Sequence, residues 1–280
     1  KGWLVGDLNK GMKAMFIMMN GARLFVGIQG LGISETAFQS SLYYSKERLQ
    51  GKKPLSKNKA DPIILHPEIR KNLLHMKSLN EGIRALTLWV GMQFDIIKNS
   101  KEINVINNAQ NIISLMTPIL KSFSTEVGCE SANLALQIYG GHGYIKDHGI
   151  EQLVRDVRIA PIYEGTNGIQ ALDLIGRKMQ IDNGALFDSY FSIINKYLET
   201  VDLNNSLDDI LNTFNNSYKD LKDVINYLKT LDKNYDEING PAVEFLELFS
   251  YVSVGFVWLQ MINISLSLKE KENTEFLLTK

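Results

Sequence analysis

Residues 69–97 read IRKNLLHMKSLNEGIRALTLWVGMQFDII, and this stretch decides the fold class. Its apolar side chains recur at steps of three and four, a spacing that places them on one side of an α-helix. The residues of this stripe are Ile69, Leu73, Met76, Leu79, Ile83, Leu86, Val90, Phe94 and Ile97. Pro67 suits the first helical turn, where no backbone N–H is needed. The stretch therefore predicts one long helix packed in a bundle of helices.

Helical spacing also prevails on both sides of this stretch, and no segment shows the sustained alternation of a β-strand, so we predict an all-α chain. Before it we expect a helix from about Met15 to Gln50 and a polar loop over residues 51–62. The inward residues of that helix should be Leu24, Ile28, Leu31, Phe38 and Leu42. After it, residues 99–111 should form a connection, and Thr117 as N-cap with Pro118 in the first turn should open the next helix.

Glycines at 140, 141 and 143 are expected to end that helix, and a short helix over residues 150–159 should stop at Pro161. Thr166 and Asn167 can cap the helix that follows. Near residues 179–184 the composition changes, so we expect a helical bundle domain over residues 1–180 and a helical extension over residues 181–280. Helices of the extension are expected at about 186–198, 207–228 and 241–268.

The charge balance and the cysteine content narrow the classes of function. Thirty Lys and Arg against thirty-one Asp and Glu give a net charge of -1, which offers no strong field for nucleic acid or anionic lipid. Cys129 is the single cysteine, so a disulfide framework and a multi-cysteine metal site are excluded. A cytoplasmic location fits this usage best. The first residues do not resemble a signal peptide, and we expect them to come from the middle of a longer chain.

Residues 248–268 carry no charge over a length that would span a bilayer. The polar residues Ser250, Ser253, Gln260, Asn263 and Ser267 nevertheless fall along one helical face. We therefore favour a buried or interfacial bundle helix over a membrane span.

The segment Ile162-Tyr163-Glu164-Gly165-Thr166 places a carboxylate between a helix ended by proline and a capped helix. Glu164 could take a proton while nearby backbone N–H groups bind negative charge on an oxygen. It could equally stabilise the following helix through its dipole, and its spacing alone favours that simpler interpretation.

A second segment, residues 137–144, exposes backbone through its glycines, although a glycine-rich helix end is more often only a turn. Arg23 and Arg48 lie in apolar or helical runs and could hold phosphate oxygens, or could form exposed ion pairs. The histidines show no spacing suited to a metal.

These segments, taken in order, resemble the acyl-CoA dehydrogenase family. The matching stretches are Gly21-Ala22-Arg23 through Glu47-Arg48, Gln137 through Tyr144, Glu151 through Asp156, and Ile162 through Asn167. The resemblance covers about residues 1–179, and several ordered motifs are more specific than one. The chain is most similar to the bacterial subgroup with a helical extension that includes 3-methylmercaptopropionyl-CoA dehydrogenase.

The resemblance implies an FAD-dependent oxidation that creates a double bond between the α and β carbons of an acyl-CoA. It makes Glu164 the base that takes the α proton, with hydride passing to flavin N5. The FAD contacts it implies are Arg48, Gln50, Gln137, Gly141, Thr166, Asn167 and Gly168. The substrate contacts it implies are Asn20, Arg23, Tyr163 and Gly165. It also implies a homodimer or homotetramer, with electron-transfer flavoprotein as the electron acceptor.

The sequence departs from the family pattern at two places and leaves alternatives open. Gly168 stands where many members carry glutamine, and Gly51 replaces an aromatic residue often found there. The amino-terminal helical domain and the central β domain of the family are absent, so we expect this chain alone to be inactive. The alternatives are an oxidase-like or non-dehydrogenating flavoprotein relative, and a purely helical interaction module.

Overall fold

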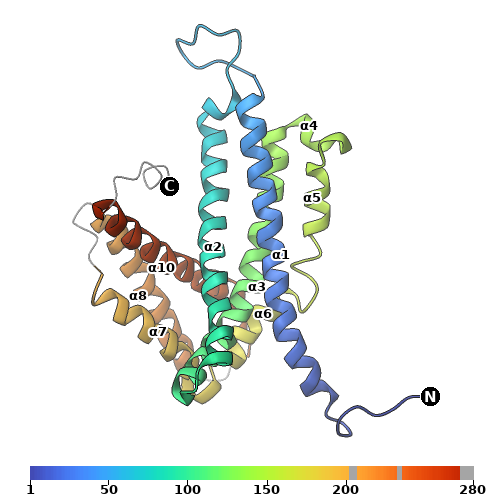
Figure 1. Cartoon of the computed structure of the whole chain (residues 1–280), viewed down its shortest axis with the longest axis vertical. Coiled ribbons are helices and arrows are strands. Elements are labelled where there is room, and N and C mark those ends of the chain that lie inside the picture. The colour runs from blue at the N-terminus through green and yellow to red at the C-terminus, as the bar shows by residue number, and fades with distance from the viewer. Residues whose placement is uncertain (202–206, 232–234, 272–280) are drawn as a thin grey trace. The chain divides into compact units, whose positions relative to one another are not determined.

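The computed structural model describes residues 1–201, 207–231 and 235–271, and these residues form helices joined by turns (Figure 1). Within them the β-type pairing is an isolated antiparallel bridge between Leu49 and Pro62. The all-α prediction is confirmed. The α-helices are α1 Gly11–Glu47, α2 Pro67–Asn99, α3 Ile103–Tyr139, α4 Gly141–Tyr144, α5 Ile150–Val157, α6 Asn167–Leu172, α7 Ala185–Leu198, α8 Asp208–Thr230, α9 Tyr235–Asn239 and α10 Ala242–Lys271. Short 3₁₀ turns lie at Ile63–Leu65, Lys146–His148 and Ile181–Gly184, and a π-helical turn at Asp173–Lys178.

The chain forms two compact units, and neither is continuous in sequence. The first unit contains residues 1–81 and 120–170, and the second contains residues 82–119 and 171–280. Helices α2 and α3 therefore contribute residues to both units. The domain division expected from composition cuts the sequence once, at residue 180, and so differs from these discontinuous units. It stays a prediction.

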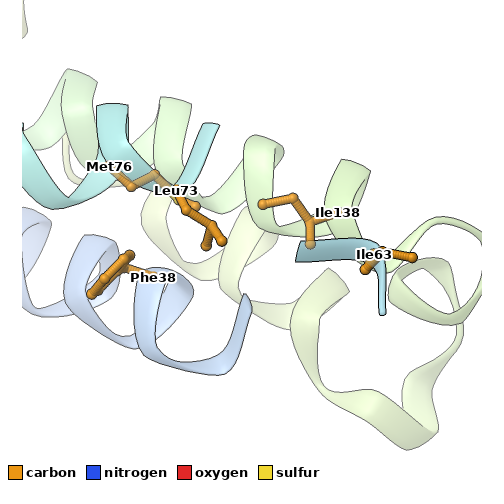
Figure 2. Close-up of a cluster of buried hydrophobic side chains, with 5 residues drawn as sticks. All are labelled: Phe38, Ile63, Leu73, Met76 and Ile138. Atoms are coloured by element: carbon orange, nitrogen blue, oxygen red, sulfur yellow. The ribbon is translucent and has the colours of Figure 1, made fainter. Parts of the chain in front are cut away.

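The core of the first unit is built by α1, the amino-terminal part of α2 and the carboxyl-terminal part of α3. Figure 2 shows Phe38 of α1, Leu73 and Met76 of α2, and Ile138 of α3 packed with Ile63. Each is at most 8% exposed, and burying such a side chain contributes about 1.5–3 kcal/mol. The apolar stripe of α2 is thus buried as predicted over its central part, whereas Phe94 near its end is 44% exposed.

Helices α1 and α3 approach closely because both carry glycine at the contact. A Cβ on Gly30 would lie 2.8 Å from the carbonyl carbon of Ser124, and one on Gly128 would lie 2.7 Å from the carbonyl oxygen of Gly30. Backbone therefore rests on backbone at this point. The inward face of α1 follows this contact, so Val26 is buried while Ile28, predicted to face inward, is 44% exposed.

The expected start of α3 at Thr117 and Pro118 is wrong. The helix begins at Ile103, and only residues 100–102 separate it from α2. Thr117 is not a cap, because its hydroxyl donates to the carbonyl of Ile113 one turn earlier. A proline inside a helix costs about 3 kcal/mol. Full burial of Ile112, Leu115 and Met116 outweighs that cost at about 1.5–3 kcal/mol each.

The second unit holds an aromatic core shared by α7, α8 and α10. Phe187 and Tyr190 of α7 pack against Phe249 of α10 with ring centroids 5.6 and 5.8 Å apart. The three helices predicted for residues 181–280 are confirmed, and the five-residue α9 is an addition to them.

Two helices, α1 and α10, are long and apolar enough to cross a membrane by length and composition. In α10, 56% of the apolar window is buried inside the structure, and in α1 29%. Ser250 and Ser253 on the polar face of α10 are fully buried, and each donates to a carbonyl of its own helix. The part of the polar face of α10 at Ser250 and Ser253 therefore points into the protein.

Candidate active site

The loop between α5 and α6 holds Glu164 in a strained backbone conformation. Glu164 has φ +56° and Gly165 has φ +87°, both in the left-handed region. Such a conformation is unfavourable for a residue with a Cβ and persists where the surroundings hold it. Gly165 is required here for a second reason, because a Cβ on it would lie 2.8 Å from Nε2 of Gln170.

Side chains from α1 and α6 hold the carbonyl groups of this loop. Nε of Arg23 donates to the carbonyl oxygen of Glu164 at 3.1 Å. Nε2 of Gln170 donates to the same oxygen at 3.3 Å and to that of Gly165 at 3.1 Å. Arg23 is 5% exposed and Gln170 is fully buried. The two residues with left-handed backbone are therefore fixed by donors that are themselves packed in place.

Lys121 of α3 holds the same loop from the side of that helix. Its Nζ donates to the carbonyl of Gly165 at 2.8 Å and to Oδ1 of Asn167 at 2.9 Å. Burial, which disfavours the ammonium, and to a lesser extent the nearby charge of Arg23 lower the pKa of Lys121 to about 8. The carboxylates of Glu126 and Glu164 oppose this shift.

The start of α6 follows the cap predicted from the sequence. The hydroxyl of Thr166 accepts a hydrogen bond from the backbone N–H of Ile169 at 3.3 Å. The Asn167 side chain is engaged inside the protein, since its amide nitrogen also donates to Oε1 of Glu126 at 2.7 Å.

The residues matched to FAD contacts near Arg48 meet in one cavity of about 570 Å³. Arg48, Gln50, Gln137 and Gly141 all line it, although up to 93 residues separate them in sequence. Nη2 of Arg48 donates to Oε1 of Gln50 at 3.2 Å. The cavity therefore combines a guanidinium, two carboxamides and bare glycine backbone.

Asp61 fixes the loop that carries Gln50 into this cavity. Its carboxylate accepts from the backbone N–H of Lys53, from the hydroxyl of Ser56 and from the amide of Asn58, each at 2.8 Å. These hydrogen bonds to the charged form, with the Lys53 N–H foremost, lower the pKa of Asp61 to about 2. Backbone bonds in both directions between Asp61 and the 50–51 segment complete the turn.

A group of stacked rings beside the cavity was not expected from the sequence. Tyr44 and Tyr139 stack at 3.9 Å, and the Tyr44 hydroxyl lies 2.8 Å from Nδ1 of His142. His142 in turn stacks with His148 at 5.0 Å. The available signal was the Tyr and His content of residues 139–148, but only folding brings Tyr44 to it.

The predicted site residues thus fall into two groups within the first unit. Arg48, Gln50, Gln137 and Gly141 line the cavity, whereas Thr166, Asn167, Gly168, Tyr163 and Gly165 surround Glu164. Of the two substrate candidates on α1, Arg23 contacts the loop and Asn20, three residues earlier, is exposed. Tyr163 is anchored to α1 by a hydrogen bond from its hydroxyl to Gln29. Arg23 and Arg48 are separated along α1 by 25 residues, or about 37 Å at about 1.5 Å per residue.

Comparisons of the sequence and of the structure with known proteins agree on the family that the chain matches. The profile of the acyl-CoA dehydrogenase C-terminal domain matches residues 9–180. The 3-methylmercaptopropionyl-CoA dehydrogenase of Ruegeria pomeroyi is 45% identical over 185 residues, which are 65% of this chain and 31% of that protein. The chain thus spans about a third of the length of the curated relative.

Solved structures show the same fold over nearly the whole chain. Caenorhabditis elegans ACDH-11, in a complex with C11-CoA, superposes with a TM-score of 0.78 at 18% identity, covering 91% of this chain and 41% of its own. An acyl-CoA dehydrogenase from Bacillus anthracis, complexed with FAD, gives 0.71 at 23% identity, covering 91% and 44%. Coverage of this extent includes most of residues 181–280, so the helical extension is also a known part of such folds. From its ordered motifs, its fold and these matches, the chain belongs to the acyl-CoA dehydrogenase family and carries that family's C-terminal domain.

Proposed function

We propose that this chain supplies the catalytic base and part of the flavin site of an enzyme that introduces an α,β double bond into an acyl-CoA thioester. The observation that carries the proposal is the held loop at Glu164. Its strained backbone is fixed by Arg23, Lys121 and Gln170, so the backbone that carries the Glu164 carboxylate is held by three separate segments of the chain. A helix-dipole role would require no such hold.

The chemistry assigned to this loop is removal of a proton. A proton on the α carbon of a thioester is only weakly acidic. Its removal places negative charge on the carbonyl oxygen, and this charge must be stabilised. In the proposal, Glu164 takes that proton through its carboxylate. Backbone N–H groups of the loop, that of Glu164 first by resemblance to the family, donate to the thioester oxygen and stabilise its charge.

The residues around the cavity fit FAD by the chemistry of their donors. Arg48 offers a charged, two-pronged donor suited to a diphosphate, and Gln50 and Gln137 offer carboxamides suited to a nucleoside. Open backbone at Gly141, where an added Cβ would meet nothing within 4 Å, leaves room for close approach. The chemistry that FAD supplies when bound is acceptance of the β hydrogen as hydride at flavin N5.

The separation of the two groups of residues supports a homo-oligomer. Arg48, the C-cap of α1, lies about 37 Å along this continuous helix from Arg23. We infer that the cavity at Arg48 completes the flavin site of a neighbouring subunit, in a homodimer or homotetramer. Thr166, Asn167 and Gly168 would then contact the flavin of their own subunit.

The finer assignments come from the resemblance to the family and, for the location, from the single cysteine. We propose an acyl-CoA substrate, electron-transfer flavoprotein as acceptor and a cytoplasmic location. The name of the Ruegeria relative does not fix the acyl group.

The proposal is tested on the whole protein loaded with flavin. Anaerobic mixing with a panel of acyl-CoAs should bleach the flavin absorbance in wild type and leave it unchanged in Glu164→Gln. Glu130→Gln, which removes an exposed carboxylate on α3, is the matched control and should reduce at the wild-type rate. Normal reduction of Glu164→Gln would refute the assignment. Reoxidation by oxygen or by electron-transfer flavoprotein then separates an oxidase from a dehydrogenase.

A further inference from the structure

Lys121 is a fully buried lysine whose hydrogen bonds reach only neutral oxygens. Its partners are the carbonyl of Gly165 and Oδ1 of Asn167. Burying an ammonium is expensive, and replacing a buried charge by an apolar side chain of similar volume is often neutral or stabilising. If Lys121 served only to pack the core, methionine would fill the same space at a lower free-energy cost of burial.

The position of Lys121 relates it to Glu164 through the backbone. In a trans peptide the carbonyl and the N–H point in opposite directions, so holding the carbonyl of Gly165 also directs the N–H of Thr166. Arg23 and Gln170 do the same for the peptide group between Glu164 and Gly165. Two consecutive peptide groups are thus oriented, and Lys121 is the donor that ties the second one to α3.

The helix that carries Lys121 is itself well anchored. A Cβ on Gly27 of α1 would lie 3.0 Å from the carbonyl oxygen of Leu120, the residue next to Lys121. Three residues further on, Gly30 contacts the backbone of Ser124 and Thr125. Lys121 therefore projects from the segment of α3 that is pressed against α1, where a small shift of the helix is opposed by backbone contact.

We propose that Lys121 is a positioning residue for the proton-abstraction step. It fixes the loop so that the Glu164 carboxylate meets the α proton at reacting distance. This inference rests on the proposed function. A displacement of about 1 Å at a reacting group can cost on the order of 100-fold in rate. Loss of the Lys121 contacts should therefore slow the chemical step more than it weakens acyl-CoA binding.

The charged groups around Lys121 are few and come from three elements. Arg23 faces it from α1, Glu126 from its own helix and Glu164 from the loop. The Nζ of Lys121 makes two hydrogen bonds, so its removal leaves the Gly165 carbonyl with Gln170 and leaves the Asn167 side chain with Thr125 and Glu126. The loop would remain attached but would lose its tie to α3 at Gly165.

The test compares Lys121→Met with Lys178→Met in the flavin-loaded whole protein. Lys178 is also a buried lysine, at 5% exposure, and it donates to Ser114 within the second unit. Lys121→Met should lower the rate constant of flavin reduction by acyl-CoA about 100-fold, while the acyl-CoA dissociation constant changes less than threefold. Lys178→Met should stay within threefold of wild type in both. Lys121→Arg, which keeps a charged donor, should recover at least tenfold of the lost rate.

Hydrogen exchange gives a readout that does not depend on turnover. The backbone N–H of Asn167 donates to the carbonyl of Pro161 at 3.0 Å and should exchange faster in Lys121→Met but not in Lys178→Met. Should Lys121→Met fail to fold, Lys121→Gln is measured by the same criteria.

The outcomes separate this inference from the proposed function. Flavin reduction within threefold of wild type in Lys121→Met, or unchanged exchange at residues 162–170, overturns the role of Lys121. Normal reduction in Glu164→Gln, or none in wild type, overturns the proposed function, and with it the positioning role of Lys121, whatever the exchange shows.

Discussion

The Nε of Arg23 donates a hydrogen bond to the carbonyl oxygen of Glu164 at 3.1 Å, across 141 residues of sequence. The bond joins the first half of α1 to the loop before α6. Because Arg23 is 5% exposed, the bond is shielded from water, and the loop cannot exchange it for a water molecule without moving.

Replacing Arg23 should therefore impair the loop more than the fold. Arg23→Leu is expected to slow flavin reduction by acyl-CoA at least tenfold, measured anaerobically by stopped flow. Arg23→Lys should not restore the rate, because lysine has no planar N–H at the position of Nε. Arg155→Leu, which removes an exposed arginine of α5, should behave as wild type. Equal rates in Arg23→Leu and wild type would contradict this prediction.

Gly165→Ala should strain the loop by two separate effects. The left-handed φ of +87° costs a residue with a Cβ about 1–2 kcal/mol, and the new methyl group would meet Nε2 of Gln170 at 2.8 Å. We expect the melting temperature to fall by several degrees. Gly168→Ala is the control, because the nearest side chain to its Cβ would be the Thr166 hydroxyl at 3.9 Å. A Gly165→Ala protein as stable as Gly168→Ala would show that the loop adapts without strain.

The α1–α3 contact gives a prediction about stability alone. Gly30→Ala forces a methyl group against the backbone of Ser124 and Thr125, where overpacking should cost about 1–3 kcal/mol or more. Gly32→Ala lies two residues away with nothing within 4 Å of its Cβ, so it should gain up to about 1 kcal/mol from the better helix propensity of alanine. Denaturant unfolding of both variants measures the difference, and the prediction fails if they change stability equally.

The stabilisation contributed by the Asp61 carboxylate should be lost in acid over a defined pH range. Its pKa falls from 3.8 to about 2 on folding, so the folded state favours the carboxylate. The stabilisation is fully present above pH 4 or so and is lost as the pH falls through about 2. Asp61→Asn should therefore lower the melting temperature at pH 6, with a difference from wild type that narrows toward pH 2. A pH-independent difference would show that the carboxylate charge is not involved.

Arg48→Ala tests the cavity as part of the flavin site. Loss of a charge-assisted hydrogen bond of about 1.5–3 kcal/mol should weaken FAD binding roughly 10–100-fold. Lys46→Ala removes an exposed cation two residues earlier and serves as the control for net charge. The measurement is FAD uptake by the apoprotein, followed by flavin fluorescence. Uptake as tight as that of Lys46→Ala would exclude Arg48 as a flavin contact.

The sequence by itself determined most of the helices and, through family motifs, the candidate base. The stripe from Leu73 to Val90 and the cap at Thr166 depend on side chains within one or two turns of each other, so their pattern is visible locally. The same local view failed at Thr117 and Pro118, because burial of Leu115 and Met116 outweighs the proline. Family motifs, rather than the spacing around Glu164, singled out that residue.

Only the tertiary structure decided how Glu164 is held and where the other site residues lie. Lys121 and Gln170 carry no sequence signal for a role at the loop, since their contacts depend on how α3 and α6 pack. Arg48 and Gln137 likewise meet in one cavity only after α1 and α3 have come together. A hydrogen bond requires its two atoms to lie about 3 Å apart in space, whereas a sequence pattern describes neighbours along the chain. Only the packing of the helices brings residues that are distant in sequence within that distance.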